Sequence, residues 1–196
     1  MQNDILRFLS TVDRLKSVRR QSYVSGSERL ENTAKHSWHV AFAAWILARS
    51  EGATVDVEKM LKIALVHDLG EIGPGDTFAY GPGDEDSAAK ERASLEAILV
   101  DVPKNVQDDV VGAWDAYGRQ ACEEARWVKV ADMLLPFLLN LATQGRTWRE
   151  NGISIEMVLK RNAPIAAMSR ELYEWMEKRA KDAVEGGWLL SERGGR

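Results

Sequence analysis

Cysteine is almost absent from this sequence, which holds Cys122 and no other among its 196 residues. No disulfide can therefore form within the chain, as is typical of proteins from a reducing compartment. The lack of a cysteine cluster also argues against a structural zinc site, which usually needs several thiolates. We interpret Cys122 as a small packing or surface residue, and we expect a cytoplasmic protein.

Long apolar runs are also missing. The longest, Met133 to Ala142, contains Pro136 and Asn140 and is far shorter than the roughly 20 apolar residues that a helix needs to cross a bilayer. The first 20 residues carry acidic side chains early and lack the continuous apolar core of a secretory signal. We therefore expect neither a membrane partner nor an export signal.

An excess of positive charge is the third absence. The formal net charge is −4, whereas domains that bind nucleic acid polymers are usually basic, so we expect no such partner. A small anionic substrate is compatible with this balance, because a local metal ion and an arginine can outweigh a weakly negative whole. With 45% hydrophobic residues, the chain can bury the core of one domain. We place this domain at residues 1–185 and a flexible tail at 186–196.

What the sequence does contain is helical periodicity along nearly its whole length, without a convincing alternating strand pattern. The segment 21–32 is polar, contains Gly26 and is interpreted as a loop. Thr33 and Asp56 are the predicted N-caps of the second and third helices. The prediction is a single globular all-α fold, with helices near residues 5–20, 33–49, 56–69, 84–100, from 103 onward, 121–143 and 154–184.

Only three histidines occur, so their positions are informative. His36 and His39 fall on the second predicted helix and His67 on the third. At 100° per residue, His36 lies in the centre of the apolar face, with Trp38 and Trp45 on the opposite face. A histidine in such a place is often a hydrogen-bonded core residue, and the alternative is a metal ligand. For His39, on the flank of the face, we favour a structural role beside the ligands.

The third predicted helix, MLKIALVHDLGE, is apolar nearly all round and ends in His67-Asp68. Burying an ionisable pair is costly unless it is compensated. A salt bridge is one solution, and a bound metal ion is the other. The same choice arises at Asp132, an isolated acid inside the apolar run of the sixth predicted helix, where a lysine or arginine partner is the structural alternative. Pro136, four residues later, predicts a kink.

A mixed set of nitrogen and oxygen donors leaves coordination positions for water and substrate, as a catalytic metal site requires. We expect one divalent ion, with Mn²⁺, Co²⁺ or Mg²⁺ fitting best and Zn²⁺ or Fe²⁺ as alternatives. The candidate ligands are His36, His67, Asp68 and Asp132.

In this order, the four residues resemble the H…HD…D signature of the HD-domain phosphohydrolases. The segments KHSWHVAFAAWILA, LVHDLGEIGPGDT and ARWVKVADML are similar to the branch that contains the 5'-deoxynucleotidases, and the resemblance covers roughly residues 4–180. It implies an all-α, typically dimeric hydrolase that uses a divalent metal to release phosphate from deoxynucleoside 5'-monophosphates.

The resemblance also implies roles outside the metal site. Glu71 corresponds to a catalytic glutamate, Arg20 to a phosphate-binding arginine, and Asp76 to an aspartate that contacts the sugar. The structural alternatives are capping or solvation for the two acids and a solvated basic stretch for the arginine. Gln21 stands where bacterial members can carry a tryptophan that contacts sugar or base, and Ala116 where a glutamate is expected. Both departures bear on selectivity for deoxyribose.

Other functions stay open at this point. Alarmone hydrolases resemble HDxxED, whereas Ile72 occupies the second acidic position here, and di-iron HD oxygenases need more histidines than the three present. A triphosphate, a modified nucleotide or another phosphate ester is an alternative substrate. A non-catalytic nucleotide-binding protein is a further alternative, although a degenerate site would be expected to lose a ligand.

Overall fold

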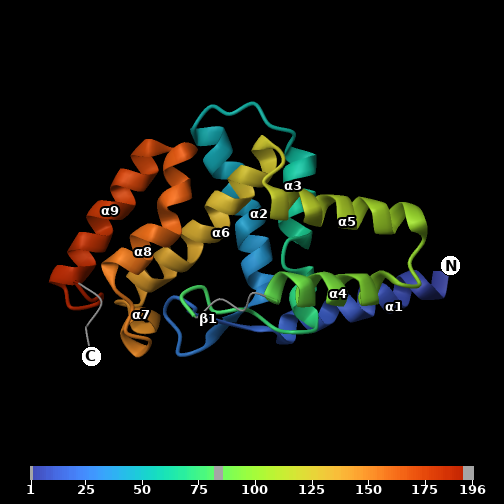
Figure 1. Ribbon diagram of the computed structural model, residues 1–196, viewed down its shortest axis with the longest axis horizontal. Helices are drawn as coiled ribbons and strands as arrows, with labels where there is room; N and C mark the ends of the chain where they lie inside the picture. The colour runs from blue at the N-terminus through green and yellow to red at the C-terminus, as the bar shows by residue number, and fades with distance from the viewer. Residues whose placement is uncertain (1, 82–85, 192–196) are drawn as a thin grey trace. The chain divides into compact units, whose positions relative to one another are not determined.

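The computed structural model describes residues 2–81 and 86–191 (Figure 1). Helices dominate these residues, which confirms the all-α prediction, and one two-stranded sheet, β1–β2, accompanies them. Among the helices of these two ranges, none is both long and apolar enough to span a membrane. The elements are α1 (Gln2–Val12), η1 (Asp13–Ser17), β1 (Arg19–Tyr23), β2 (Leu30–Asn32), α2 (Thr33–Ser50), α3 (Val57–Val66), η2 (Leu69–Ile72), α4 (Ser87–Leu99), α5 (Lys104–Arg119), α6 (Glu123–Ala142), α7 (Arg146–Glu150), α8 (Ile155–Asn162), η3 (Ala163–Ala167) and α9 (Arg170–Glu185).

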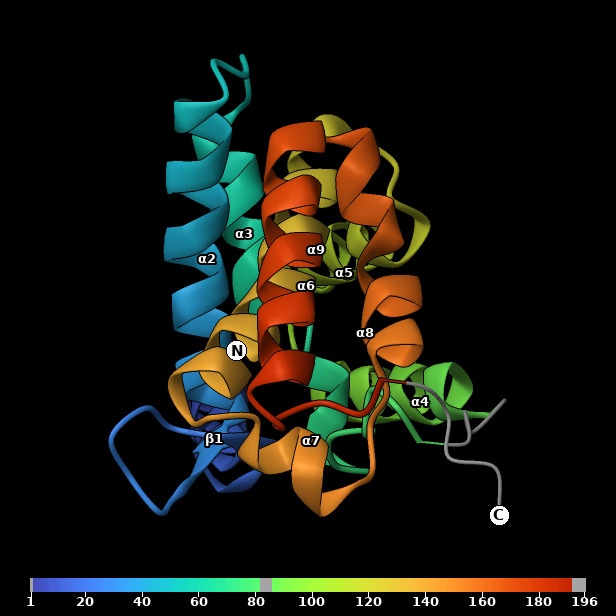
Figure 2. The ribbon, with the colours of Figure 1, turned by 90° about the vertical axis from the view of Figure 1, so that its left-hand side faces the viewer.

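Two compact units divide the chain, residues 1–20 with 32–129 and residues 21–31 with 130–196. In the first unit, α2 and α3 lie side by side, as Figures 1 and 2 both show, and η2 packs against α4. The predicted boundary of one domain at residue 185 stays a prediction. Buried apolar side chains from η1, η2, α4 and the turn after α4 form a core cluster in this unit: Leu15, Leu69, Ile72, Leu95, Leu99 and Val102.

The second unit has an aromatic core. Phe137 of α6 and Trp148 of α7 are buried, with ring centroids 5.5 Å apart. The chain after α9 returns to the start of α8, where the Leu190 backbone N–H donates to the Ile153 carbonyl at 3.1 Å. Residues 192–196 of the expected tail lie outside the described residues.

The segment interpreted as a loop, residues 21–32, is largely a β-hairpin, so that prediction was wrong. Strands β1 and β2 pair with each other, and Gly26 between them has a φ of 68°, which glycine adopts readily. Burial alternates along β1. The alternation was hidden in the sequence because the buried positions are Arg20 and Ser22 rather than apolar residues.

The helix ends follow local chemistry. Asn32, and not Thr33 as predicted, is the N-cap of α2, and its side chain accepts a hydrogen bond from the Lys35 backbone N–H at 3.0 Å. Asp56 caps α3 as predicted, accepting from the Lys59 backbone N–H at 3.1 Å.

Four helix boundaries differ from the predictions. The first helix, predicted to end around Arg19 and Arg20, ends at Val12 and is followed by η1 and β1. Helix α3 ends at Val66, three residues early, and continues into η2 after His67 and Asp68. The long helix predicted over residues 154–184 is divided into α8, η3 and α9, because Pro164 lacks a backbone N–H and Ser169 caps a new helix. The helix predicted to begin near residue 84 is described only from residue 86, and α4 begins at Ser87.

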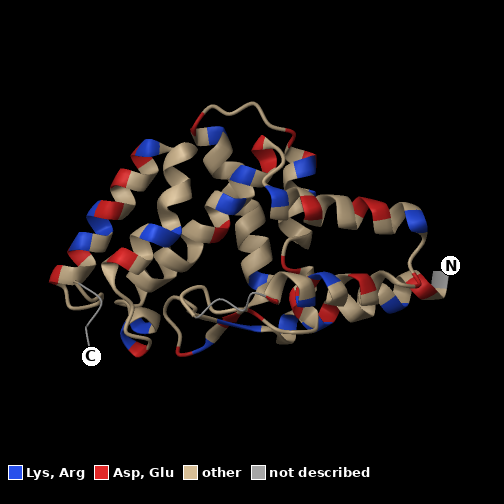
Figure 3. Cartoon of the chain, in the orientation of Figure 1, with Lys and Arg blue, Asp and Glu red and all other residues tan. Residues whose placement is uncertain are grey.

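Acidic and basic side chains are interspersed along the outer helices, as Figure 3 shows for α9. Several form pairs one helical turn apart, such as Lys62 with Glu58 at 3.0 Å and Arg179 with Asp182 at 3.1 Å. Exposed pairs of this kind contribute little to stability, about 0–1 kcal/mol each. The fold therefore depends on its buried apolar side chains, and the buried charges described next need a separate explanation.

Candidate active site

Helix α2 carries His36 into the interior of the first unit. The side chain of His36 is fully buried, together with those of Val40 and Ala44 on the same face. Trp38, on the opposite face, is 66% exposed. The burial therefore follows the helical period expected from the sequence. His39 is half-buried, and its ring lies 6.1 Å from that of Trp38.

The end of α3 presents His67 and Asp68 next to each other. His67 is the C-terminal cap of α3, and Asp68 leaves the helical conformation with φ −106° and ψ 11°. Gly70 then lets η2 approach α4 closely, because a Cβ at this position would come within 2.7 Å of the Glu91 carbonyl oxygen. A glycine is therefore required here by close packing rather than by a special backbone angle.

The two histidines converge on one carboxylate. The Nε2 atoms of His67 and His36 lie 3.1 and 3.9 Å from Asp68 Oδ2, and the two ring centroids are 5.7 Å apart. His67 Nδ1 is 2.7 Å from the Ala64 carbonyl and donates to it, so Nε2 is the nitrogen that would bind a metal ion. Among the described residues, the buried Nε2 of His67 has no hydrogen-bond partner. Two imidazole nitrogens beside a carboxylate oxygen fit a divalent metal ion.

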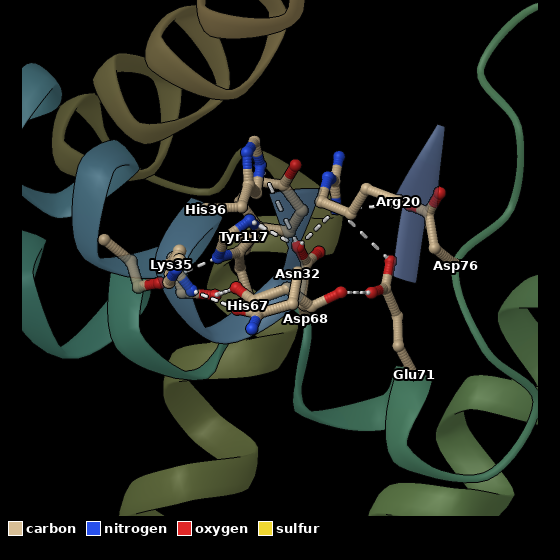
Figure 4. Close-up of polar contacts among 12 residues, drawn as sticks. Arg20, Asn32, Lys35, His36, His67, Asp68, Glu71, Asp76 and Tyr117 are labelled. Atoms are coloured by element: carbon tan, nitrogen blue, oxygen red, sulfur yellow. Dashed lines mark hydrogen bonds and ion pairs between the residues drawn. The ribbon is translucent and has the colours of Figure 1, made fainter. Parts of the chain in front are cut away.

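Arg20 of β1 lies at the centre of a group of carboxylates (Figure 4). Its Nη1 is 3.0 Å from Asp68, 3.2 Å from Asp76 and 3.6 Å from Glu71, and its side chain is only 10% exposed. The neighbouring Arg19 is exposed. Arg20 therefore does not belong to a solvated basic stretch, and one guanidinium faces three acids.

The acids of this cluster differ in their proton affinity. Burial alone would raise the pKa of Asp68, but the charges of His67, Arg20 and His36 outweigh it and lower the pKa to about 2. For Glu71, burial and the negative charges of Asp68 and Asp76 raise the pKa to about 9. The surroundings therefore favour the ionised form of Asp68 and the protonated form of Glu71.

Three participants were not found from the sequence. Thr33 donates from its hydroxyl to Glu71 Oε2 at 2.8 Å, and both side chains are buried. Glu91 of α4 has a raised pKa because of burial and the nearby charges of Asp68 and Asp76. Tyr117 of α5 packs its ring against that of His67, with centroids 5.0 Å apart. No local sequence pattern identifies these three positions, because each interacts with residues that are distant in the sequence.

The sequence singled out three further residues, Asp132, Gln21 and Ala116. Asp132 is buried on α6 in the second unit, so its role as a ligand stays a prediction. Gln21 also belongs to the second unit, where its carbonyl accepts from the Thr147 hydroxyl at 2.8 Å. Ala116 is half-buried on α5, and the neighbouring Asp115 pairs with Arg119 at 2.8 Å.

The chain belongs to the HD-domain family, whose model, described as "HD domain", matches residues 12–173. It is 33% identical over 140 residues to the 5'-deoxynucleotidase YfbR of Escherichia coli, covering 67% of this chain and 69% of that protein. It is 29% identical over 134 residues to the 5'-deoxynucleotidase HDDC2 of Xenopus laevis. That match covers 65% of this chain, which spans 63% of the relative's length.

A solved structure shares the fold over nearly the whole chain. It is described as a predicted metal-dependent phosphohydrolase from Magnetospirillum magnetotacticum, with a TM-score of 0.87 and 30% sequence identity. The match covers 96% of this chain and 95% of the other. The helical HD-domain fold is therefore shown, and the fold family implies a divalent metal.

Proposed function

We propose that this protein is a metal-dependent phosphohydrolase that releases phosphate from nucleoside 5'-monophosphates, with deoxyribonucleotides as the preferred class. The observation that carries this proposal is a buried cluster in which two imidazoles and a carboxylate converge beside a guanidinium and a glutamate, Glu71. The names of the relatives YfbR and HDDC2 support the choice of substrate class.

The metal site of the proposal consists of His36, His67, Asp68 and Asp132. The first three converge within the first unit. Asp132 is added because it is a buried acid on α6, an otherwise apolar stretch of helix where a carboxylate needs a cation. The nitrogen and oxygen donors favour Mn²⁺, Co²⁺ or Mg²⁺. When bound, such an ion supplies positive charge that activates water and offsets the charge of the phosphate.

Arg20 binds the phosphate group in this proposal. Its guanidinium is held among Asp68, Glu71 and Asp76, and its planar array of donors matches phosphate oxygens. Asp76, at 3.2 Å from the same guanidinium, accepts a hydrogen bond from a sugar hydroxyl in this proposal. Gln21 follows Arg20 in the chain and is the candidate for a further sugar or base contact.

Glu71 supplies the proton for the leaving group. Thr33 donates to Oε2, which leaves Oε1 to carry the proton that the raised pKa retains. A water oxygen attacks phosphorus, the bond between phosphorus and the nucleoside O5' breaks, and the proton of Glu71 passes to O5'. The products are a nucleoside and inorganic phosphate, and Glu71 regains its proton from the water that was consumed.

The protein acts in the cytoplasm as a homodimer in this proposal. Apolar side chains stand in two adjacent turns on the outer face of α2, where Trp38 is 66%, Phe42 50% and Trp45 40% exposed. Their spacing of four and three residues matches the seam of paired helices. Each such ring can bury about 150–250 Å², and a stable interface needs roughly 800 Å² per partner. This ridge would form the apolar centre of the interface.

Sedimentation equilibrium tests the dimer. We expect Phe42→Glu to be monomeric because it places a charge at the centre of the ridge, whereas Leu9→Glu on α1, which is similarly exposed at 57%, should remain dimeric. A dimeric Phe42→Glu protein, or a monomeric wild type, would contradict the assignment.

Phosphate release tests the activity. The protein is stripped of metal with a chelator, and Mn²⁺, Co²⁺, Mg²⁺ or Zn²⁺ is added back with a panel of 5'-mononucleotides in ribo and deoxy forms. Metal-dependent release from monophosphates is the expected result. The panel also includes triphosphates, which are an alternative substrate class. Because Gln21 and Ala116 depart from the deoxynucleotidase pattern, the ratio of release from deoxy and ribo forms tests the sugar preference. If no phosphate is released from any nucleotide, the proposal is wrong.

A further inference from the structure

A tyrosine and a lysine stand behind His67, and the proposed hydrolysis uses neither. Tyr117 comes from α5 and meets the His67 ring at 61°, in the edge-to-face arrangement that aromatic pairs favour. Figure 4 shows Tyr117 among the side chains of the site. Because His67 is buried and ends α3, the ring of Tyr117 forms part of the wall that holds it.

Lys129 of α6 fixes the tyrosine in turn. Its Nζ donates to the Tyr117 hydroxyl at 2.8 Å and lies 4.9 Å from the centroid of the same ring. The two helices meet through a tight connection, in which Gln120 has a φ of 51° and its backbone N–H donates to the Tyr117 carbonyl at 3.1 Å. The phenol therefore has a defined position from both its backbone and its hydroxyl.

The imidazole of His67 is thus held from two directions. The hydrogen bond from Nδ1 to the Ala64 carbonyl fixes one side of the imidazole, and contact with the Tyr117 ring restricts the tilt of the imidazole plane. As a result, Nε2, the nitrogen that would bind the metal, faces Asp68 Oδ2 at 3.1 Å. Outer-shell groups that orient a ligating histidine, most often by hydrogen bonds, typically change metal affinity about 10–100-fold when they are removed.

We propose that Tyr117 and Lys129 are positioning residues for the metal site, acting through the orientation of the His67 imidazole. This inference rests on the metal site of the proposed function and deepens it. Neither residue is assigned a contact with substrate. The ring of Tyr117 carries the larger effect, and Lys129 acts by holding that ring in place.

The test is metal affinity, measured without nucleotide. Metal-free protein is titrated with Co²⁺ in competition with a chelating dye, and the visible spectrum of bound Co²⁺ reports its coordination. We expect Tyr117→Leu to weaken Co²⁺ binding about 10–100-fold and to change the spectrum. Tyr117→Phe keeps the ring and should lose only a few-fold, as should Lys129→Met.

Trp114→Leu is the matched control. Trp114 lies one turn earlier on α5, and its ring is engaged by the Arg92 guanidinium at 5.6 Å rather than by His67. This variant should lose stability while keeping its affinity for Co²⁺. Circular dichroism confirms that each variant is folded. Wild-type affinity in Tyr117→Leu overturns the inference, and so does an equal loss in the control.

The outcome is separable from that of the proposed function. If no nucleotide is hydrolysed but Tyr117→Leu still weakens Co²⁺ binding, the positioning role stands and the substrate assignment fails. Lys129→Met with unchanged Co²⁺ affinity and a raised KM for the phosphate ester would instead make Lys129 a substrate contact and overturn its positioning role.

Discussion

Asp68 and Glu71 lie one turn apart and face the same guanidinium, yet their surroundings drive them in opposite directions. Two imidazoles and Arg20 favour the ionised form of Asp68, whose pKa falls to about 2, whereas burial beside other acids favours the protonated form of Glu71, whose pKa rises to about 9. Asp68 is thereby suited to bind a cation and Glu71 to donate a proton. Asp68 and Glu71 are both carboxylic acids, so the difference between them comes from their neighbours rather than from the residue type.

The largest effect is expected at Asp68. Asp68→Asn removes the charge on which both histidines converge, so metal-dependent phosphate release should fall by more than the roughly 10–100-fold typical of losing an outer-shell group, and Co²⁺ binding should fall with it. Asp101→Asn, which removes an exposed carboxylate 3.8 Å from Arg7, is the control and should match the wild type. An active Asp68→Asn enzyme would contradict the role of Asp68 as the carboxylate that binds the cation.

Glu71→Gln should separate chemistry from metal binding. It keeps the shape of the side chain but has no proton to transfer, so kcat should fall about 10²–10⁴-fold while Co²⁺ affinity changes little. The alkaline limb of the wild-type pH–rate profile should also be absent from the variant. Equal losses of Co²⁺ affinity and of kcat would show that Glu71 contributes to metal binding rather than to proton transfer.

The pH dependence of the stability of the metal-free protein also distinguishes Asp68 from Glu71. Because the folded pKa of Glu71 is raised, its contribution is fully present below the unfolded value of about 4.5 and is lost as pH rises toward about 9. The folded pKa of Asp68 is lowered, so its contribution is present above about 3.8 and is lost as pH falls toward about 2.

We therefore expect the Tm of the metal-free wild type to decline between pH 5 and pH 9, measured by thermal unfolding in the presence of a chelator. Glu71→Gln should show a shallower decline and a higher Tm at pH 9. Identical slopes for the two proteins would mean that Glu71 is ionised in the folded state.

The smallest effect is expected at Thr33. Thr33→Val keeps the shape of the side chain and removes the hydroxyl that donates to Glu71, which should lower the free energy of unfolding by about 0.5–1.5 kcal/mol and shift the alkaline limb of the rate profile upward. Urea unfolding measures the first effect. Ser37→Ala, one turn further along α2, removes a buried hydroxyl bonded to the Thr33 carbonyl and should leave the rate profile in place.

Periodicity predicted part of this site. The 3.6-residue repeat placed His36 on the buried face of α2, and the apolar run before His67 identified a buried helix end. The same reasoning could not place Arg20, because its strand buries an arginine and a serine and so lacks the apolar alternation that marks a half-buried strand. The hairpin was missed for this reason.

The resemblance to a known family supplied the roles of Glu71, Arg20 and Asp76, and the structure brings all three together. Sequence reasoning could not find Thr33 or Tyr117, since their functions lie in contacts with residues far away along the chain. Thr33 was interpreted only as a cap, and the structure gives that role to Asn32.

Gly70, which lies between Asp68 and Glu71 in the sequence, allows helix α4 to fix the position of both acids. A Cβ at Gly70 would come within 2.7 Å of the Glu91 carbonyl oxygen, and the Gly73 N–H donates to the Ser94 hydroxyl at 3.0 Å, so this turn packs closely against α4 at two points. Asp68 and Glu71 flank Gly70, and a methyl group added there would displace the turn that carries both. By packing against this turn, helix α4 sets the spacing between the carboxylate proposed to bind the cation, Asp68, and the proposed proton donor, Glu71.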